Sequence, residues 1–267
     1  MKLYKIGAVL AVIICIIALV FSYLSWQNKL ENAVAEPEEQ VAQTSEKKEP
    51  ATGTTKKEST SDISVNIEEL SANTDQAVQE LLKARNDEGE KVQLLIAGSA
   101  ALDSGEPGYA ERLKRSLEDS YDGFIEVDVL SLNGTSEALI GGNVDLSAGY
   151  DLVLLEPMTL MNNDRIAIEQ EREHITAFNE AVTAEVEDAV LVLHPPQPIY
   201  GAGYYLAQVA ALDEFAAIYG YAYIDHWAAW PDTDDEELKD YLTEDGLPND
   251  QGAGLWADEL EAYFIAD

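Results

Sequence analysis

Histidine, cysteine and basic residues are all scarce in this chain of 267 residues. It has 3 histidines, one cysteine, and 16 lysines and arginines against 51 acidic residues, which gives a net charge of −35. One cysteine excludes an intramolecular disulfide. The cysteine and the histidines also lack the spacing of zinc ligands, so we expect neither a metal nor a cofactor. A charge of this sign repels phosphates, and nucleic acid is therefore not an expected partner.

The negative charge is unevenly spread along the chain. Residues 1–62 hold 7 basic and 8 acidic residues and are almost neutral, so the acidity belongs to residues 63–267. A strongly hydrated acidic surface suits salty or alkaline surroundings. We prefer that interpretation to a specific cation site.

The start of the chain predicts a membrane anchor. Residues 6–26 are apolar and uncharged, and about 20 such residues cross a bilayer as a helix. Lys2 and Lys5 flank this stretch, so the positive-inside rule places the N-terminus in the cytoplasm and the rest of the chain outside. We therefore predict a single-pass cell-membrane protein with a signal-anchor helix over 1–26. The sequence Ala33-Val34-Ala35 leaves open cleavage of a signal peptide.

Two further regions follow the anchor. Residues 27–62 are rich in Glu, Lys, Thr, Ser and Pro and poor in large apolar side chains, which predicts a disordered linker. Residues 63–267 alternate between apolar runs and helical spacing, such as that over 164–187 and the final stretch 256–264. This alternation predicts an α/β domain whose parallel sheet carries helices on both faces. Five runs predict buried strands: 92–97, 124–130, 152–155, 189–193 and 221–224.

Polar or titratable residues follow the predicted strands. Ser99 follows the first, Gly134 comes shortly after the second, Glu156 follows the third, His194 the fourth, and His226 comes just after the fifth. In a parallel sheet these positions meet at one edge, where ligands bind. We therefore predict the functional site at this edge, with His194 and Glu156 as candidate pocket residues.

Four blocks resemble those of the SGNH/GDSL hydrolases, a family of serine esterases and acyl-ester hydrolases. "LLIAGSAALDSGEPGYAERL" is similar to the first block, with Ser99 at the nucleophile position. "SLNGTS" resembles the second, which gives the N–H of Gly134 to the oxyanion hole. "DLVLLEPMTLMNND" resembles the third, whose oxyanion-hole asparagine corresponds to Asn162 or Asn163. "TEDGLPNDQGAGLWADEL" is similar to the last, with Asp245 at the catalytic aspartate.

The resemblance implies a flavodoxin-like three-layer sandwich with a five-stranded parallel sheet. Residues 91–265 also look like a Bacillus-type branch of membrane-anchored members. Two positions depart from the family pattern. The first block usually reads Gly-Asp-Ser, but here Gly98 precedes the serine, and the usual histidine of the last block is replaced by Pro248.

A serine hydroxyl needs a base to take its proton, and histidine is the usual one. His174 is expected on a helix surface, far from the strand ends. His226 is therefore our candidate for the base, oriented by Asp245, and His194 is a second candidate. Packing of His226 beside neighbouring tryptophans is the alternative.

Two functions follow from these residues. The first is an exported esterase or acetyl-ester hydrolase that acts on an acylated small molecule or an envelope glycan. Ser99 would then attack the acyl carbon, and the N–H groups of Ser99 and Gly134, with Asn163, would stabilise the oxyanion. The second is a catalytically impaired module of the same fold that binds a cell-envelope glycan or another ligand.

Overall fold

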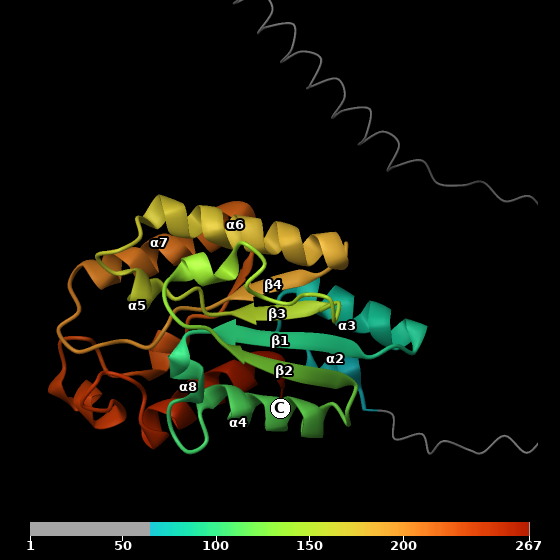
Figure 1. Ribbon diagram of the computed structural model, residues 1–267. Helices are drawn as coiled ribbons and strands as arrows, with labels where there is room; N and C mark the ends of the chain where they lie inside the picture. Colours follow the sequence, from blue (N-terminus) through green and yellow to red (C-terminus); the bar gives the residue numbers. More distant parts are fainter. Residues whose placement is uncertain (1–64, 267) are drawn as a thin grey trace, which may run out of the picture. The chain divides into compact units, whose positions relative to one another are not determined.

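The computed structural model describes residues 65–266 (Figure 1). The predicted anchor over 6–26 and the predicted linker over 27–62 lie outside the described residues. Within 65–266, no helix combines the length and the apolar character that crossing a bilayer requires.

A five-stranded parallel sheet forms the centre of the domain, as the apolar runs predicted. Its strand order is β2-β1-β3-β4-β5, and every neighbouring pair is parallel. This is the flavodoxin-like order, in which the direction of strand addition reverses between β1 and β3. The strands are β1 (Val92–Gly98), β2 (Ile125–Ser131), β3 (Leu152–Leu155), β4 (Val190–Leu193) and β5 (Ala222–Tyr223).

Helices cover both faces of this sheet (Figure 1). The α-helices are α2 (Ile67–Leu70), α3 (Gln76–Glu88), α4 (Tyr109–Ser120), α5 (Thr159–Asn162), α6 (Ile168–Glu185), α7 (Tyr204–Tyr219) and α8 (Asp250–Phe264). Short 3-10 helices are η1 (Ala100–Asp103), η2 (Ser136–Leu139), η3 (His226–Ala229) and η4 (Glu236–Tyr241).

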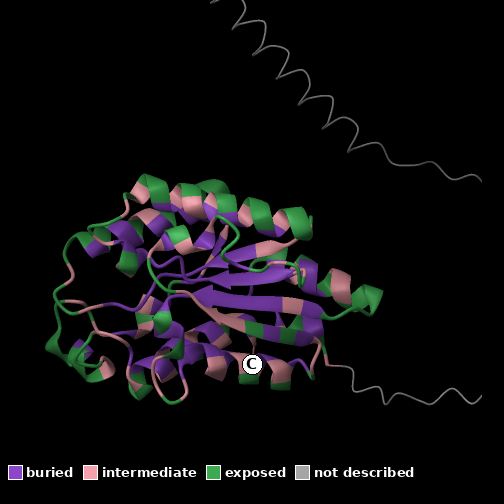
Figure 2. Cartoon of the chain, in the orientation of Figure 1, coloured by how far each residue is buried: buried purple, intermediate pink, exposed green. Residues whose placement is uncertain are grey.

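The sheet separates two hydrophobic cores because side chains alternate along each strand. On β1, Leu94 and Ile96 pack with apolar residues of α3, α4 and α8, whereas Leu95 and Ala97 pack with those of α6 and α7. Figure 2 shows β1, β3 and β4 as almost continuously buried, whereas β2 also has exposed residues. The three layers are therefore helices, sheet and helices, and the predicted fold class is confirmed for this domain.

The predicted helix boundaries needed one notable correction. The final helix starts at Asp250, earlier than the predicted 256, because Asn249 caps it. The Asn249 side-chain oxygen accepts the N–H groups of Gln251 at 2.9 Å and Gly252 at 3.1 Å. Such a cap satisfies amide groups that have no partner inside the helix.

An ion pair ties α3 to the sheet edge opposite the predicted site. Arg85 Nε donates to Asp151 Oδ1 at 2.8 Å, and Arg85 Nη2 donates to Asp188 Oδ1 at 3.0 Å. The other oxygen of Asp151 accepts the N–H of Gln93 at 2.8 Å. The Arg85 and Asp151 side chains are only 14% and 10% exposed. This pair therefore joins α3, β1 and β3 at the amino ends of the strands.

Candidate active site

Ser99 lies at the carboxyl end of β1, as predicted. The residue has extended backbone and caps η1, where its Oγ accepts the N–H of Ala101 at 3.3 Å. It is 7% exposed, so its hydroxyl is accessible only from the cavity beside it. The local sequence accounts for this position, because a serine at the end of a strand can cap the turn that follows.

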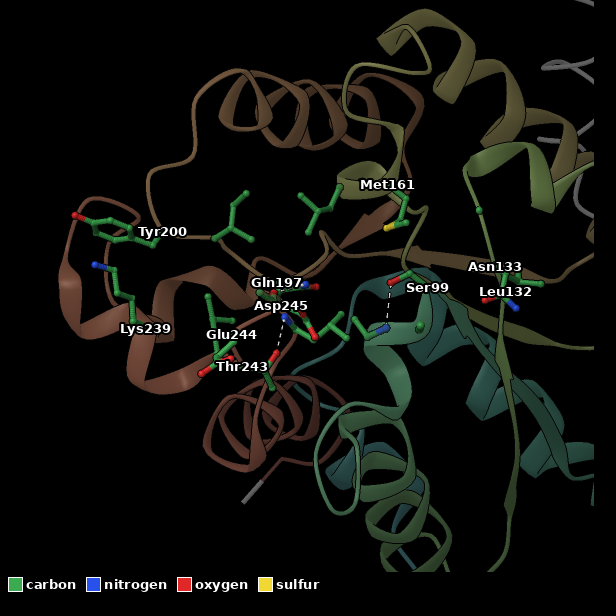
Figure 3. A pocket seen from close by; sticks show the side chains of 18 residues that line it. Ser99, Leu132, Asn133, Met161, Gln197, Tyr200, Lys239, Thr243, Glu244 and Asp245 are labelled. Carbon is green, nitrogen blue, oxygen red and sulfur yellow. Dashed lines mark hydrogen bonds between the residues drawn. The ribbon is translucent and has the colours of Figure 1, made fainter.

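A cavity of about 800 Å³ opens at this edge of the sheet. Ser99, Gly134 and Asp245 all line it, so the structure brings together three of the predicted site residues. Figure 3 shows Ser99 and Asp245 in the same pocket, although they belong to opposite ends of the domain sequence. The rest of the wall is largely apolar and includes Leu132, Leu160, Met161, Ile199, Leu242 and Leu247.

The Gly134 loop is held by two hydrogen bonds at Ser136. The Ser136 N–H donates to Asn162 Oδ1 at 2.9 Å, and the Ser136 hydroxyl lies 2.8 Å from His174 Nδ1. Gly134 itself has a φ of +99°, a conformation that favours glycine. His174, expected on the surface, is half-buried. Through its contact with Ser136, it helps to fix the loop that carries Gly134.

Neither asparagine is among the cavity-lining residues, which corrects the predicted oxyanion-hole role of Asn162 or Asn163. Asn162 is fully buried, and its side-chain oxygen is used to hold Ser136. Asn163 follows the last residue of α5, and its side-chain oxygen is buried without a hydrogen-bond partner in the described part of the chain. The shifted spacing of this block therefore leaves both asparagines outside the set of residues that line the cavity.

Glu156 is fully buried beneath Ser99 and does not line the cavity, which corrects its predicted pocket role. Its Oε2 accepts the N–H of Ser99 at 2.7 Å, and its Oε1 accepts the N–H of Met158 at 2.7 Å. Burial raises the pKa of Glu156, and these two hydrogen bonds act in the opposite direction. The Ser99 N–H is thus bonded to a carboxylate, which differs from its predicted role in the oxyanion hole.

His226 is also absent from the cavity wall, and the structure gives it a packing role in place of the predicted base role. It is fully buried, with Nε2 2.8 Å from the carbonyl of Pro195. Its Nδ1 accepts a hydrogen bond from Trp230 Nε1 at 3.1 Å. Both ring nitrogens are therefore engaged. Burial, and the proximity of His194, lower the pKa of His226 well below its usual value.

His194 packs among aromatic side chains beside His226 and does not line the cavity, which corrects its predicted pocket role. It is fully buried, and its ring makes edge contacts with Tyr109, His226 and Trp256 at centroid distances of 5.9, 5.8 and 5.7 Å. Neither of its nitrogens has a hydrogen-bond partner within the described residues. Burial lowers the pKa of His194 to about 3, so the ring is neutral at physiological pH.

The segment from Lys239 to Leu247 supplies the pocket wall that sequence reasoning missed, apart from Asp245. The Lys239 ammonium lies 3.8 Å from the centroid of the Tyr200 ring and 3.5 Å from Glu236. No spacing in the sequence links Tyr200 to Lys239, because their contact depends on how the loop after β4 packs against η4. The resemblance at Asp245 was the one signal for this wall.

Comparisons with known proteins agree with this fold. No family model matches the chain, and no curated protein matches it. Among solved structures, the domain is similar to one described as a lipolytic protein of the G-D-S-L family from Desulfitobacterium hafniense, with a TM-score of 0.51 at 18% identity over 65% of this chain and 99% of that one.

Two further structures give the same result. A lipase from a goat rumen metagenome aligns with a TM-score of 0.51 at 16% identity over 66% of this chain and 99% of its own. A GDSL-like lipase from Parabacteroides merdae aligns with a TM-score of 0.52 at 14% identity over 65% and 95%. The domain therefore has the fold of the GDSL, or SGNH, hydrolases, as its sequence blocks suggested.

Proposed function

We propose that the protein is a membrane-tethered, extracytoplasmic serine ester hydrolase of the SGNH type, with Ser99 as its nucleophile. The observation that carries this proposal is the meeting of Ser99, Gly134 and Asp245 on one cavity at the carboxyl edge of the sheet. Ligands of open α/β sheets bind at this edge. The apolar stretch 6–26 supports the tether, and its flanking lysines support the outward orientation.

The cavity favours a neutral substrate with an apolar acyl group. Its volume of about 800 Å³ lies within the range of small-molecule sites. Leucine, isoleucine and methionine side chains form much of the wall, whereas Glu244 and Asp245 add negative charge near Ser99. With a net charge of −35, the chain repels anionic substrates. Acylated sugars and small acyl esters meet these requirements.

In the proposed reaction, Ser99 Oγ attacks the acyl carbon and the N–H of Gly134 stabilises the oxyanion. Asp245 takes the hydroxyl proton and returns it to the leaving alcohol, and water then cleaves the acyl-enzyme. Carboxylates are in general weaker bases than imidazole, and no histidine lines the cavity. Turnover is therefore expected to be slow, since loss of the usual base costs several orders of magnitude in rate.

A specific observation also favours a second candidate, a binding module without turnover. The Ser99 N–H is donated to Glu156, and both buried histidines near the sheet edge lie outside the cavity wall. Such a module would keep the cavity and hold an acylated envelope ligand without cleaving it.

Hydrolysis of p-nitrophenyl acetate and butyrate by the purified full chain separates the two candidates. The matched control for Ser99→Ala is Ser147→Ala, because Ser147 is exposed and does not line the cavity. The hydrolase proposal requires activity that Ser99→Ala lowers at least about 100-fold and Ser147→Ala leaves unchanged. Equal rates for the two variants would refute the nucleophile. Binding of an acyl ester by an inactive wild type would favour the module.

The tether needs its own experiment. Alkaline phosphatase is active only outside the cytoplasm of a bacterial host, so it reports orientation when fused to the C-terminus. We expect activity in the membrane fraction for the full chain and no activity after deletion of residues 1–26. Activity that stays in the cytoplasmic fraction would contradict the proposed orientation.

A further inference from the structure

We propose that Glu156 is a positioning residue that fixes the backbone of the nucleophile and the pocket wall at the same time, and that Gly98 is required to admit its side chain. The inference rests on the proposed function for its catalytic consequence, though not for its geometry. It starts from a buried acid that does not line the cavity and that makes no ion pair among residues 65–266.

The first step is the double hydrogen bond of the Glu156 carboxylate. Each oxygen accepts one backbone N–H at 2.7 Å, from Ser99 at the tip of β1 and from Met158 in the loop after β3. Hydrogen bonds to an ionised acceptor are shorter and stronger than those between neutral groups. The carboxylate therefore joins two neighbouring strands beyond the last residues of their ladder.

The second step is the strain that this arrangement holds. Met158 has a φ of +57°, an uncommon conformation for a residue with a side chain. It directly precedes α5, which carries the cavity-lining residues Leu160 and Met161. Strained backbone persists where surrounding contacts hold it. The bond from the Met158 N–H to Glu156 is one such contact, so the same carboxylate sets the place of Ser99 and of the wall facing it.

The third step explains why glycine stands directly before the nucleophile. A Cβ added at Gly98 would lie 2.7 Å from the Cβ of Glu156 and 3.0 Å from its Oε2. The same Cβ would lie 2.7 Å from Leu102 Cδ1, and real Cβ atoms do not approach neighbours this closely, so any side chain at this position would displace both Glu156 and the Leu102 side chain. The glycine at position 98 therefore leaves room for Glu156, which directly follows β3.

The test compares Glu156→Gln with Glu171→Gln. Glu171 is also a buried glutamate, but its carboxylate accepts from Thr159 and does not contact Ser99. A glutamine at 156 presents one acceptor and one donor to two N–H groups, so one amide loses its partner. We expect amide hydrogen exchange at Ser99 or Met158 to accelerate at least about 10-fold in Glu156→Gln, and in Glu171→Gln to be no faster than in the wild type.

The catalytic consequence is measured by labelling of Ser99 with a fluorophosphonate ester. We expect Glu156→Gln to slow labelling at least about 10-fold, with no change in Glu171→Gln. Gly98→Ala leaves the carboxylate in the chain but displaces it, so it should reproduce both effects and provides a second variant should Glu156→Gln fail to fold. Unchanged exchange at the Ser99 and Met158 amides would show that Glu156 does not hold these two N–H groups. Accelerated exchange with unchanged labelling would show that Glu156 does not position the nucleophile. A wild type that does not label would refute the proposed function, while the exchange data would still decide whether Glu156 holds the Ser99 and Met158 amides.

Discussion

The imidazole of His226 lies parallel to the indole of Trp256, with 4.4 Å between ring centroids and 13° between the planes. Trp256 stacks on its other neighbour, Tyr109, with 4.0 Å between centroids. His226 also contacts the carbonyl of Pro195 and the indole N–H of Trp230. The ring is therefore a structural part of the core between η3 and α8.

The first prediction concerns this ring. We expect His226→Ala to lower the free energy of unfolding by about 3 kcal/mol, because it leaves a cavity and removes the partner of a buried indole N–H. The rate of ester hydrolysis per folded molecule should stay within about threefold of the wild type, because the ring does not line the cavity. Urea denaturation and hydrolysis at 15 °C measure the two effects. Full stability with abolished hydrolysis would restore His226 as the base.

The second prediction concerns the pH dependence of stability. Burial raises the pKa of Glu171 from an ordinary value of 4.5 to about 7. The folded state therefore binds this proton more tightly than the unfolded state, and the resulting stability is present below pH 4.5 and lost as the pH rises towards 7. The loss amounts to at most about 3 kcal/mol.

Glu171→Gln should remove this loss, because the glutamine oxygen can still accept from Thr159 without carrying a charge. Urea denaturation at intervals from pH 4.5 to 8 would follow the difference between the wild type and the variant. We expect the variant to gain stability relative to the wild type across this window. A difference that stays constant with pH would contradict the raised pKa.

The third prediction compares two ion pairs. Arg85→Met should destabilise the domain by about 3 kcal/mol, because it leaves the largely buried Asp151 carboxylate without its cation. Lys83→Met is the matched control, since Lys83 pairs with Glu68 where both side chains are more than half exposed. That variant should change the free energy of unfolding by less than about 0.5 kcal/mol. Similar losses in the two variants would contradict the role assigned to burial.

The fourth prediction concerns salt. A net charge of −35 opposes compaction through self-repulsion, which dissolved ions screen. The melting temperature should therefore rise between 0.05 and 1 M salt, and sodium and potassium chloride should act alike. Millimolar calcium should add nothing beyond its ionic strength. A large stabilisation by calcium alone would instead indicate a specific cation site.

The sequence predicted the sheet well because its signals are local. Apolar runs mark strands, and the end of β1 directly before Ser99 follows from Gly98 and the loop beyond it. The position of Asp245 at the site was predicted from the resemblance of its sequence block to the last SGNH block. Packing of His226 beside a neighbouring tryptophan was the predicted alternative, and Trp230 is that partner. The stacking of His226 on Trp256 and the bond from Ser136 to Asn162 could not be predicted, because a single sequence does not show which distant atoms fill the space around a side chain. Residue type alone suggested a base and an oxyanion donor, whereas packing made both residues part of the framework.

The cavity wall from Lys239 to Leu247 runs from within η4 towards α8 and lies outside the sheet. Tyr241, Leu242 and Leu247 in this segment also pack against the core, so an exchange of the segment must keep these apolar positions. Lys239 and Glu244 are exposed and line the cavity. Substitution of these two side chains therefore offers a direct route to redesigning what the cavity accepts.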